Sequence, residues 1–414
     1  MGRERTRKIV VLAGQVDHGK STLAGRLLLD TGSVAQEKIE RCRAQCAARG
    51  LDFEPAFLVD ALKEEQRDLK TVNAARVLLR VHTGEREEQE ILLVDTPGHE
   101  EFVTSLVTGA AGAELALFVV SAEEALTETA RKQLHLLSFL GIHDLVIFIN
   151  KLDLVTDPSA AIAARRQEID GAIKEFPFTV RSTIAGSAKT GLHVASKALG
   201  DNLTVLDALL NANYADSRHK EPFRFWVQDV TRDEKQGILT LGTVLSGTLC
   251  GGDTLIQYPH EIETHCEEVI LPSGALDASA GAGAALALKL SPCSQIRRGV
   301  LLTKKGEPQP SVSFQFEATI CNLASAALAT GRKVTLRIGT AETQGKIERF
   351  MENGVDSNRV SLERYGFAAA RITAASACIL DRVRDVPDAG RFVLSSGGRI
   401  VACGLITQPL PPAP

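Results

Sequence analysis

One short run near the N-terminus has the residue types and spacing to bind phosphate. Gly14 to Ser21 reads Gly-Gln-Val-Asp-His-Gly-Lys-Ser, a glycine and four variable residues followed by Gly-Lys-Ser. Glycines let the backbone curl so that its N–H groups point inward, and a following helix N-terminus adds positive potential. Lys20 would reach the β- and γ-phosphates, and the Ser21 hydroxyl would ligate Mg²⁺. The residues expected to bind the nucleotide here are Gly14, Val16, Asp17, His18, Gly19, Lys20, Ser21 and Thr22.

A second candidate group is Asp95-Thr96-Pro97-Gly98, which follows the apolar run Ile91–Val94. A carboxylate at the end of such a strand can hold Mg²⁺ through water. The N–H of Gly98 could contact the γ-phosphate and so sense its loss. Asp95 is therefore expected to belong to the metal site with Ser21.

The third and fourth groups are suited to a purine base. Asn150-Lys151-Leu152-Asp153 follows the apolar run Leu145–Ile149, and an aspartate there can accept hydrogen bonds from N1–H and the 2-amino group of guanine. Adenine lacks that donor pair, so such a site would prefer guanine. A further loop containing Ser187, Ala188 and Lys189 could touch the guanine oxygen. Each motif is weak alone, but their order along the chain predicts GTP and GDP as ligands.

The elements that would position these groups alternate between strands and helices. Apolar runs at Lys8–Ala13, Ile91–Val94, Leu115–Val120 and Leu145–Ile149 are typical of buried parallel strands. Helical patterns such as Lys20–Asp30 and Thr127–Leu140 separate them. This alternation predicts an α/β sheet covered by helices on both faces, which would be a P-loop GTPase domain.

After about residue 218 the pattern changes to short strands separated by glycine-containing turns. Such regular spacing is typical of small β-barrels. We predict joints near Ser217–Pro222 and Gly306–Pro310. The expected domains are therefore 1–218 for nucleotide binding, 219–308 for a first β-barrel and 309–414 for a second.

Composition limits the remaining function classes. The 414 residues carry a net charge of −4, so no general basic field for nucleic acid is expected, although a local patch could exist. No apolar run approaches the roughly 18 residues of a membrane span, so no membrane partner is expected. The eight scattered cysteines form no Cys-x-x-Cys pair and fit a reducing, cytoplasmic compartment.

These motifs together resemble the translation-factor GTPases. The resemblance rests on Val16-Asp17-His18-Gly19-Lys20, Asp95-Thr96-Pro97-Gly98-His99-Glu100 and Asn150-Lys151-Leu152-Asp153, and it extends over the whole chain. That family includes elongation factor Tu, its archaeal and eukaryotic counterpart elongation factor 1-alpha, and the GTPase subunit of ATP sulfurylase. By resemblance, His99 would orient the attacking water and Thr71 would ligate Mg²⁺ when GTP is bound. His18 is expected to shape the loop rather than to act in catalysis.

Within the family, the long segment between Lys20 and Thr71 is more similar to the eukaryotic elongation factor and to the sulfurylase subunit than to elongation factor Tu. The runs Gly25–Ser33 and Phe57–Gln66 also resemble sulfurylase-type relatives. The resemblance therefore implies a Mg-dependent GTPase whose partner is an adenylyltransferase-type catalytic subunit. An aminoacyl-tRNA carrier for the ribosome shares every nucleotide motif and stays an alternative.

The first switch departs from the family pattern. Where relatives have Gly-Ile-Thr, this chain reads Leu69-Lys70-Thr71. Leucine lacks the conformational freedom of glycine, and Lys70 cannot shield the catalytic histidine as an apolar residue does. Three readings stay open: Lys70 contacts phosphate or a partner, hydrolysis is slow in a GTP-gated adaptor, or Lys70 points to solvent.

Overall fold

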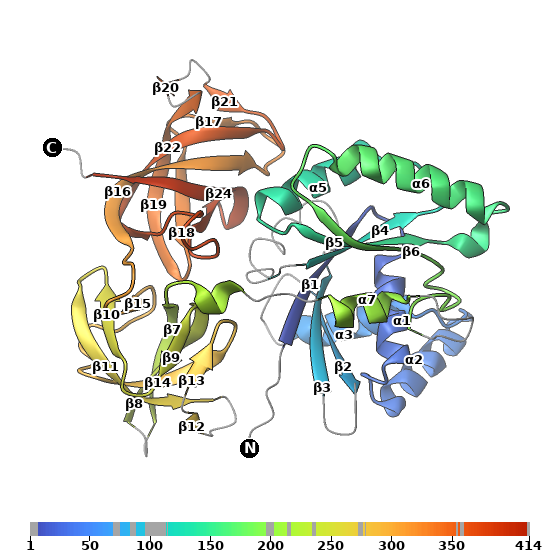
Figure 1. Cartoon of the computed structure of the whole chain (residues 1–414), viewed down its shortest axis with the longest axis horizontal. Helices are drawn as coiled ribbons and strands as arrows, with labels where there is room; N and C mark the ends of the chain where they lie inside the picture. The colour runs from blue at the N-terminus through green and yellow to red at the C-terminus, as the bar shows by residue number, and fades with distance from the viewer. Residues whose placement is uncertain are drawn as a thin grey trace. The chain divides into compact units, whose positions relative to one another are not determined.

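The computed structural model of the 414-residue chain describes residues 7–68, 75–82, 88–95, 113, 115–195, 203–212, 217–233, 237–271, 276–277, 279–352, 355–356 and 360–411. The chain forms two units, Met1–Tyr214 and Ala215–Pro414. The first is an α/β domain, and the second contains two β-barrels (Figure 1). The predicted fold class, a P-loop GTPase domain followed by two small barrels, is confirmed. The domain limits at 218/219 and 308/309 stay predictions.

The first unit is built on one six-stranded sheet in the order β2-β3-β1-β4-β5-β6. Its strands are β1 (Arg7–Gly14), β2 (Ala75–His82), β3 (Glu88–Asp95), β4 (Leu115–Ser121), β5 (Asp144–Asn150) and β6 (Thr179–Ala185). Its helices are α1 (Lys20–Asp30), α2 (Gln36–Ala48), α3 (Ala56–Asp68), α5 (Glu128–Phe139), η1 (Leu152–Leu154), α6 (Pro158–Ile173) and α7 (Val205–Asn211). All strand pairs are parallel except β2–β3.

Helices cover both faces of this sheet, as the sequence pattern predicts. Figure 1 shows α1, α3 and α7 on one face and α5 and α6 on the other. A core cluster joins side chains of α1, α3 and α7 to alternate residues of the strands, with Leu12, Leu117 and Phe148 fully buried. The strand order reverses direction at β1, and in open α/β sheets ligands bind at such a switch point, outside the carboxyl ends of the strands.

The first barrel follows η2 (Ser217–Lys220) and closes through pairing of β10 with β11. Its closed ring has the order β10-β15-β7-β8-β14-β11, with every pair antiparallel. Its strands are β7 (Arg224–Asp233), β8 (Gly237–Ser246), β9 (Thr248–Cys250), β10 (Thr254–Tyr258), β11 (Ile262–Ile270), β12 (Leu276–Asp277), β13 (Ser279–Gly281), β14 (Ala285–Ser291) and β15 (Leu301–Lys304). Closure removes the exposed edges that an open sheet would present.

The second barrel closes in the same way through β18 and β19, in the order β18-β23-β24-β16-β22-β19. Its strands are β16 (Ser311–Asn322), β17 (Leu328–Ala329), β18 (Lys333–Ile338), β19 (Ala341–Glu352), β20 (Val355–Asp356), β21 (Ser361–Leu362), β22 (Phe367–Leu380), β23 (Arg391–Ser396) and β24 (Arg399–Leu410). Phe316 and Phe392 meet edge to face in its core, with ring centroids 5.3 Å apart. No helix among the residues described is long and apolar enough to cross a bilayer.

The two barrels share a packed interface. Trp226, Tyr258 and Leu301 of the first barrel belong to the core cluster of the second. A Cβ atom at Gly339 would lie 2.2 Å from the Trp226 ring, so only glycine allows this approach. The Thr340 hydroxyl donates to Val227 O at 2.7 Å. Trp226 thus packs between the two barrels.

Candidate nucleotide-binding site

The phosphate loop connects β1 to α1 at the switch point of the sheet. Gly19 is the N-cap of α1 and has φ 88°, and Asp17 also has a left-handed φ of 63°. A Cβ at Gly19 would lie 2.3 Å from Asn150 Nδ2, so the position accepts only glycine. The N-terminal end of α1 follows the loop directly, and a helix N-terminus is the arrangement that binds phosphate oxygens. Val16 at the loop tip is 59% exposed.

Lys20 lies over the loop rather than away from it. Its ammonium donates to Gly14 O at 2.7 Å and to Gln15 O at 2.6 Å. The cation is therefore held against the carbonyl groups of the first two loop residues. Ser21 and Thr22 follow in the first turn of α1, both half-buried. The roles of Lys20 and Ser21 at the outer phosphates and the metal ion stay predictions.

Asn150, at the carboxyl end of β5, connects two of the predicted loops. Its Nδ2 donates to His18 O at 2.9 Å, and its Oδ1 accepts the Ala188 N–H at 2.8 Å. The side chain is buried, with an exposed fraction of 3%. A buried amide with both ends bonded fixes the phosphate loop and the Ser187–Lys189 loop in one arrangement. The structure thus brings together three of the four motifs found in the sequence.

The two loops expected to contact the base, Asn150–Asp153 and Ser187–Lys189, contain one strained backbone position and two exposed side chains. Lys151 has a left-handed φ of 67°, an unfavourable conformation for a residue with a Cβ. Asp153, in η1, and Lys189 are exposed, whereas Ser187 and Ala188 are fully buried. The Ser187 hydroxyl accepts the Thr190 N–H at 3.2 Å and so shapes its own turn. Asp153 is therefore free to meet a base, and Ser187 supports the loop.

His18 is a buried member of the phosphate loop, with an exposed fraction of 1%. Its Nδ1 accepts the Ser121 N–H at 3.2 Å, which leaves the proton on Nε2, 3.5 Å from Glu124 Oε2. Burial lowers the pKa of His18, against the opposing effect of the Glu124 carboxylate, so the neutral ring is favoured. A neutral, anchored imidazole shapes the loop, in line with the conformational role expected for it.

Two glutamines that sequence reasoning missed anchor the phosphate loop to α5. Gln133 Oε1 accepts the Gly14 N–H at 3.1 Å, and Gln15 Oε1 accepts the Thr127 N–H at 3.2 Å. Gln133 lies with Ala130, Leu134 and Leu137 on the buried stripe of α5. A polar residue within an apolar stripe at helical spacing was the signal that could have identified it.

The remaining predicted site residues lie outside what the structure describes. Thr71, Gly98 and His99 are among them, as are the switch residues Leu69 and Lys70. Asp95 ends β3, but its side chain is not described. No cluster of three or more metal-ligating His, Cys, Asp or Glu side chains occurs in the described part of the chain. The roles of Asp95 and Thr71 at the metal ion, and of His99 at the attacking water, therefore stay predictions.

Comparison with known proteins matches this arrangement to one family. Residues 4–217 match the model of the elongation factor Tu GTP binding domain, and residues 315–407 match the GTP-eEF1A C-terminal domain-like model. The first match covers more than half of the chain. The chain therefore belongs to the family of proteins built on the elongation factor Tu GTP-binding domain, and it is a GTP-binding, translation-factor-like GTPase by descent.

Relatives within the family carry different names. The chain is 27% identical to elongation factor 1-alpha of Archaeoglobus fulgidus, over 99% of this chain and all of that protein. It is also 27% identical to sulfate adenylyltransferase subunit 1 of Chromobacterium violaceum, over 96% of this chain and 85% of that protein. It is 29% identical to the bifunctional enzyme NodQ of Rhizobium sp. strain N33, over 92% of this chain and 60% of that protein. A solved structure of sup35 complexed with GDP aligns over 98% of this chain and 95% of that one, with 19% identity and a TM-score of 0.45.

Proposed function

We propose that this protein is a GTP-hydrolysing switch that serves as the regulatory GTPase partner of a sulfate adenylyltransferase. The observation that carries the nucleotide half of this proposal is the bridge made by Asn150, which holds the phosphate loop and the Ser187–Lys189 loop together. Exposed Asp153 lies three residues further on, at the place suited to the guanine edge. We place the protein in the cytoplasm, a proposal supported by eight cysteines that all stay free thiols.

Hydrolysis would convert GTP and water to GDP and inorganic phosphate with Mg²⁺ as cofactor. Ser21, Asp95 and Thr71 would supply or orient the oxygen ligands that this hard cation prefers, and Ser21 stands in the first turn of α1 as that role requires. Bound Mg²⁺ would neutralise charge on the β- and γ-phosphates. Lys20, already held against the loop carbonyl groups, would take part of the same charge. His99 would orient the attacking water.

The γ-phosphate would also act as the switch signal. We expect it to hold Thr71 and Gly98 in place, so that its loss releases both loops and the barrels shift against the GTPase domain. Small-angle scattering of the protein with a GTP analogue and with GDP tests this step. Identical curves in the two states would contradict it.

The relatives include both an elongation factor and a sulfate adenylyltransferase subunit, so the main question is which partner this protein binds. The sulfate adenylyltransferase role is supported by the subunit 1 relative and by the runs Gly25–Ser33 and Phe57–Gln66. The net charge of −4 also provides no general basic field for a polynucleotide. The near-full-length match to elongation factor 1-alpha favours the second candidate, a carrier of aminoacyl-tRNA to the ribosome.

A pull-down from native extract distinguishes these candidates. Tagged protein is loaded with a non-hydrolysable GTP analogue or with GDP, and bound protein and RNA are identified. We expect GTP-dependent recovery of an adenylyltransferase-type protein, and this recovery should disappear in an Asp153→Ala variant that no longer holds guanine nucleotide. GTP-dependent recovery of tRNA would overturn the sulfate adenylyltransferase assignment.

The unusual switch residues call for a separate assay of turnover. Single-turnover GTP hydrolysis by the native chain is compared with that of a Lys70→Ile variant. If Lys70 impairs the switch, the variant should hydrolyse GTP faster, and the native protein would be a slow, GTP-gated adaptor. Equal rates would exclude an impaired switch and place Lys70 outside the hydrolytic step.

A further inference from the structure

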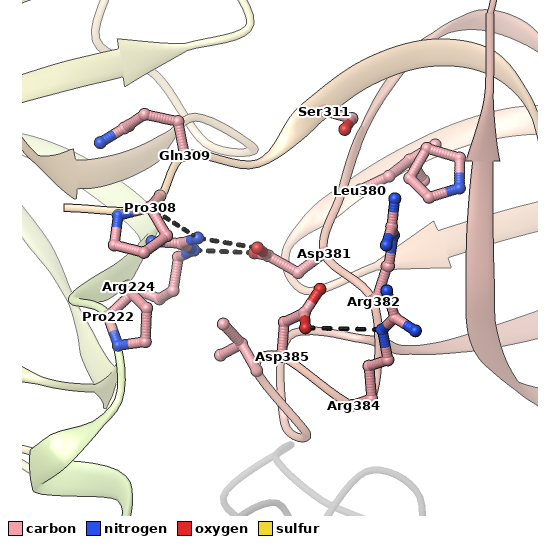
Figure 2. Close-up of a pocket in the computed structure, with 12 residues that line it drawn as sticks. Pro222, Arg224, Pro308, Gln309, Ser311, Leu380, Asp381, Arg382, Arg384 and Asp385 are labelled. Atoms are coloured by element: carbon pink, nitrogen blue, oxygen red, sulfur yellow. Dashed lines mark hydrogen bonds and ion pairs between the residues drawn. The ribbon is translucent and has the colours of Figure 1, made fainter.

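A cavity of about 600 Å³ lies between the two barrels, and its lining is remote in sequence from every nucleotide motif. Figure 2 shows it between the start of β7 and the segment that follows β22. Its lining is Pro222, Arg224, Pro308, Gln309, Ser311, Leu380, Asp381, Arg382, Arg384, Asp385, Val386 and Pro409. Cavities of this size hold small-molecule ligands in other proteins.

The floor of the cavity is a neutral ion pair whose donors are mostly engaged within the protein. Arg224 Nε and Nη2 donate to the two oxygens of Asp381, each at 2.7 Å. Nη1 also donates to Phe223 O at 2.9 Å, and Nη2 donates to Pro308 O at 3.0 Å. Both side chains are buried, with exposed fractions of 1% and 6%. This pair therefore builds the site without contributing net charge.

The wall presents two further guanidinium groups with unused donors. Arg384 contacts the Asp385 carboxylate through Nε at 3.6 Å, a loose and exposed pair. Within the described part of the chain, no hydrogen bond or ion pair engages the half-buried Arg382 guanidinium. Figure 2 shows both arginines on the same stretch of chain, opposite Arg224. Two cations and one carboxylate leave this wall with a charge of +1.

The segment that carries these arginines is held in place by its backbone. Val383 N–H donates to Ile406 O at 2.9 Å, and Arg382 O accepts N–H groups from Asp385 and Val386 at 2.9 and 3.0 Å. A fixed backbone lowers the entropy that binding would cost. Guanidinium groups present planar pairs of donors that match carboxylate, phosphate and sulfate oxygens. Beside them, the rings of Pro222, Pro308 and Pro409 supply apolar surface.

We propose that this cavity is a binding site for a small organic anion, in which Arg382 and Arg384 hold a carboxylate or phosphoryl group and the apolar lining contacts the body of the molecule. The site is separate from the nucleotide loops. A ligand there contacts both barrels and so stabilises their mutual arrangement by mass action.

Calorimetric titration with phenyl phosphate, benzoate and inorganic phosphate tests the proposal, using the full chain saturated with GDP so that the phosphate loop is occupied. Fluorescence of Trp226, the only tryptophan, gives a second signal because Trp226 lies two residues from Arg224 on the same face of β7. We expect phenyl phosphate or benzoate to bind more tightly than inorganic phosphate. Which of the two binds more tightly identifies the anionic group of the ligand.

An Arg382→Ala/Arg384→Ala variant should weaken binding about tenfold or more, because it removes both charge-assisted contacts. The matched control is Arg332→Ala/Arg399→Ala, which removes the same charge from two residues of the second barrel that do not line the cavity. The exposed single change Arg384→Ala should give an intermediate loss without threatening the fold. Equal weakening by the control, or no binding of any probe to the native chain, would overturn the proposal.

Discussion

The phosphate loop and the interface between the barrels are both precise polar assemblies, but they are built differently. In the phosphate loop, backbone groups from a short segment are held by neutral amides such as those of Asn150 and Gln133. In the barrel interface, a charged pair from residues 157 positions apart, Arg224 and Asp381, is buried with almost no access to water. The second arrangement uses nearly all of the Arg224 donors within the protein. The comparison teaches that neutral amides position a short backbone segment, whereas a buried ion pair joins two barrels.

The largest effect should come from breaking the buried ion pair. Asp381→Ala leaves the Arg224 guanidinium without its partner in a site with little access to water. Such a change costs about 3–5 kcal/mol of unfolding free energy. Chemical denaturation measures it, with Glu342→Ala as control, because the Arg337–Glu342 pair is exposed and should contribute less than about 1 kcal/mol. Similar losses in the two variants would show that burial does not set the strength of the interface pair.

The next effect concerns the amide that joins the nucleotide loops. Asn150→Ala leaves His18 O and the Ala188 N–H without their partner, and each buried orphan costs about 1–3 kcal/mol. GDP affinity, measured by fluorescence titration, should fall at least about tenfold. Asn322→Ala is the matched control, because Asn322 is equally buried and bonds Ala326 O, Leu362 O and Ala324 N–H within the second barrel. The Asn322→Ala variant should lose stability but retain GDP affinity. If its GDP affinity also falls, the effect of Asn150→Ala is not specific to the nucleotide loops.

A smaller effect is expected at Gln133. Gln133→Leu removes the acceptor of the Gly14 N–H and should weaken GDP binding by a few-fold, since one neutral hydrogen bond contributes about 1 kcal/mol. Gln133→Glu keeps an acceptor oxygen at the same place and should restore most of the affinity. If the glutamate variant binds as weakly as the leucine variant, the hydrogen bond is not what positions the loop.

The smallest effect is a pH dependence located in the barrels. Burial raises the pKa of Cys266 to about 12 and that of Cys378 to about 11. An unfolded thiol titrates near 8.5, so the stability from these thiols is complete below that pH and is lost as pH rises toward 11–12. Between about pH 8 and 9 each thiol should lower the unfolding free energy by less than about 1 kcal/mol. Denaturation at both pH values should show a smaller drop in a Cys266→Ala/Cys378→Ala variant, and an unchanged drop would assign the effect to other groups.

The contrast also explains what could be predicted from the sequence. Lys20, Asn150 and Ser187 stand in short motifs whose function depends on local backbone geometry, so the sequence indicated the loops and the α/β fold around them. Gln133 was missed because its role depends on a helix packing against a loop more than a hundred residues away. The Arg224–Asp381 pair was missed for the same reason, since no local pattern reports which strands of two barrels meet. Cys42 and Cys46 lie with Ile39 on the buried face of α2.

Nucleotide selectivity tests the central claim most directly. GTP and ATP binding are measured for the native chain and for Asp153→Ala, a change on an exposed side chain that leaves the Asn150 bridge intact. The account predicts that the native chain binds GTP far more tightly than ATP, and that the variant loses most of this preference because the N1–H and 2-amino donors of guanine no longer find their acceptor. Equal binding of GTP and ATP by the native chain would contradict the assignment of this protein as a guanine-nucleotide switch.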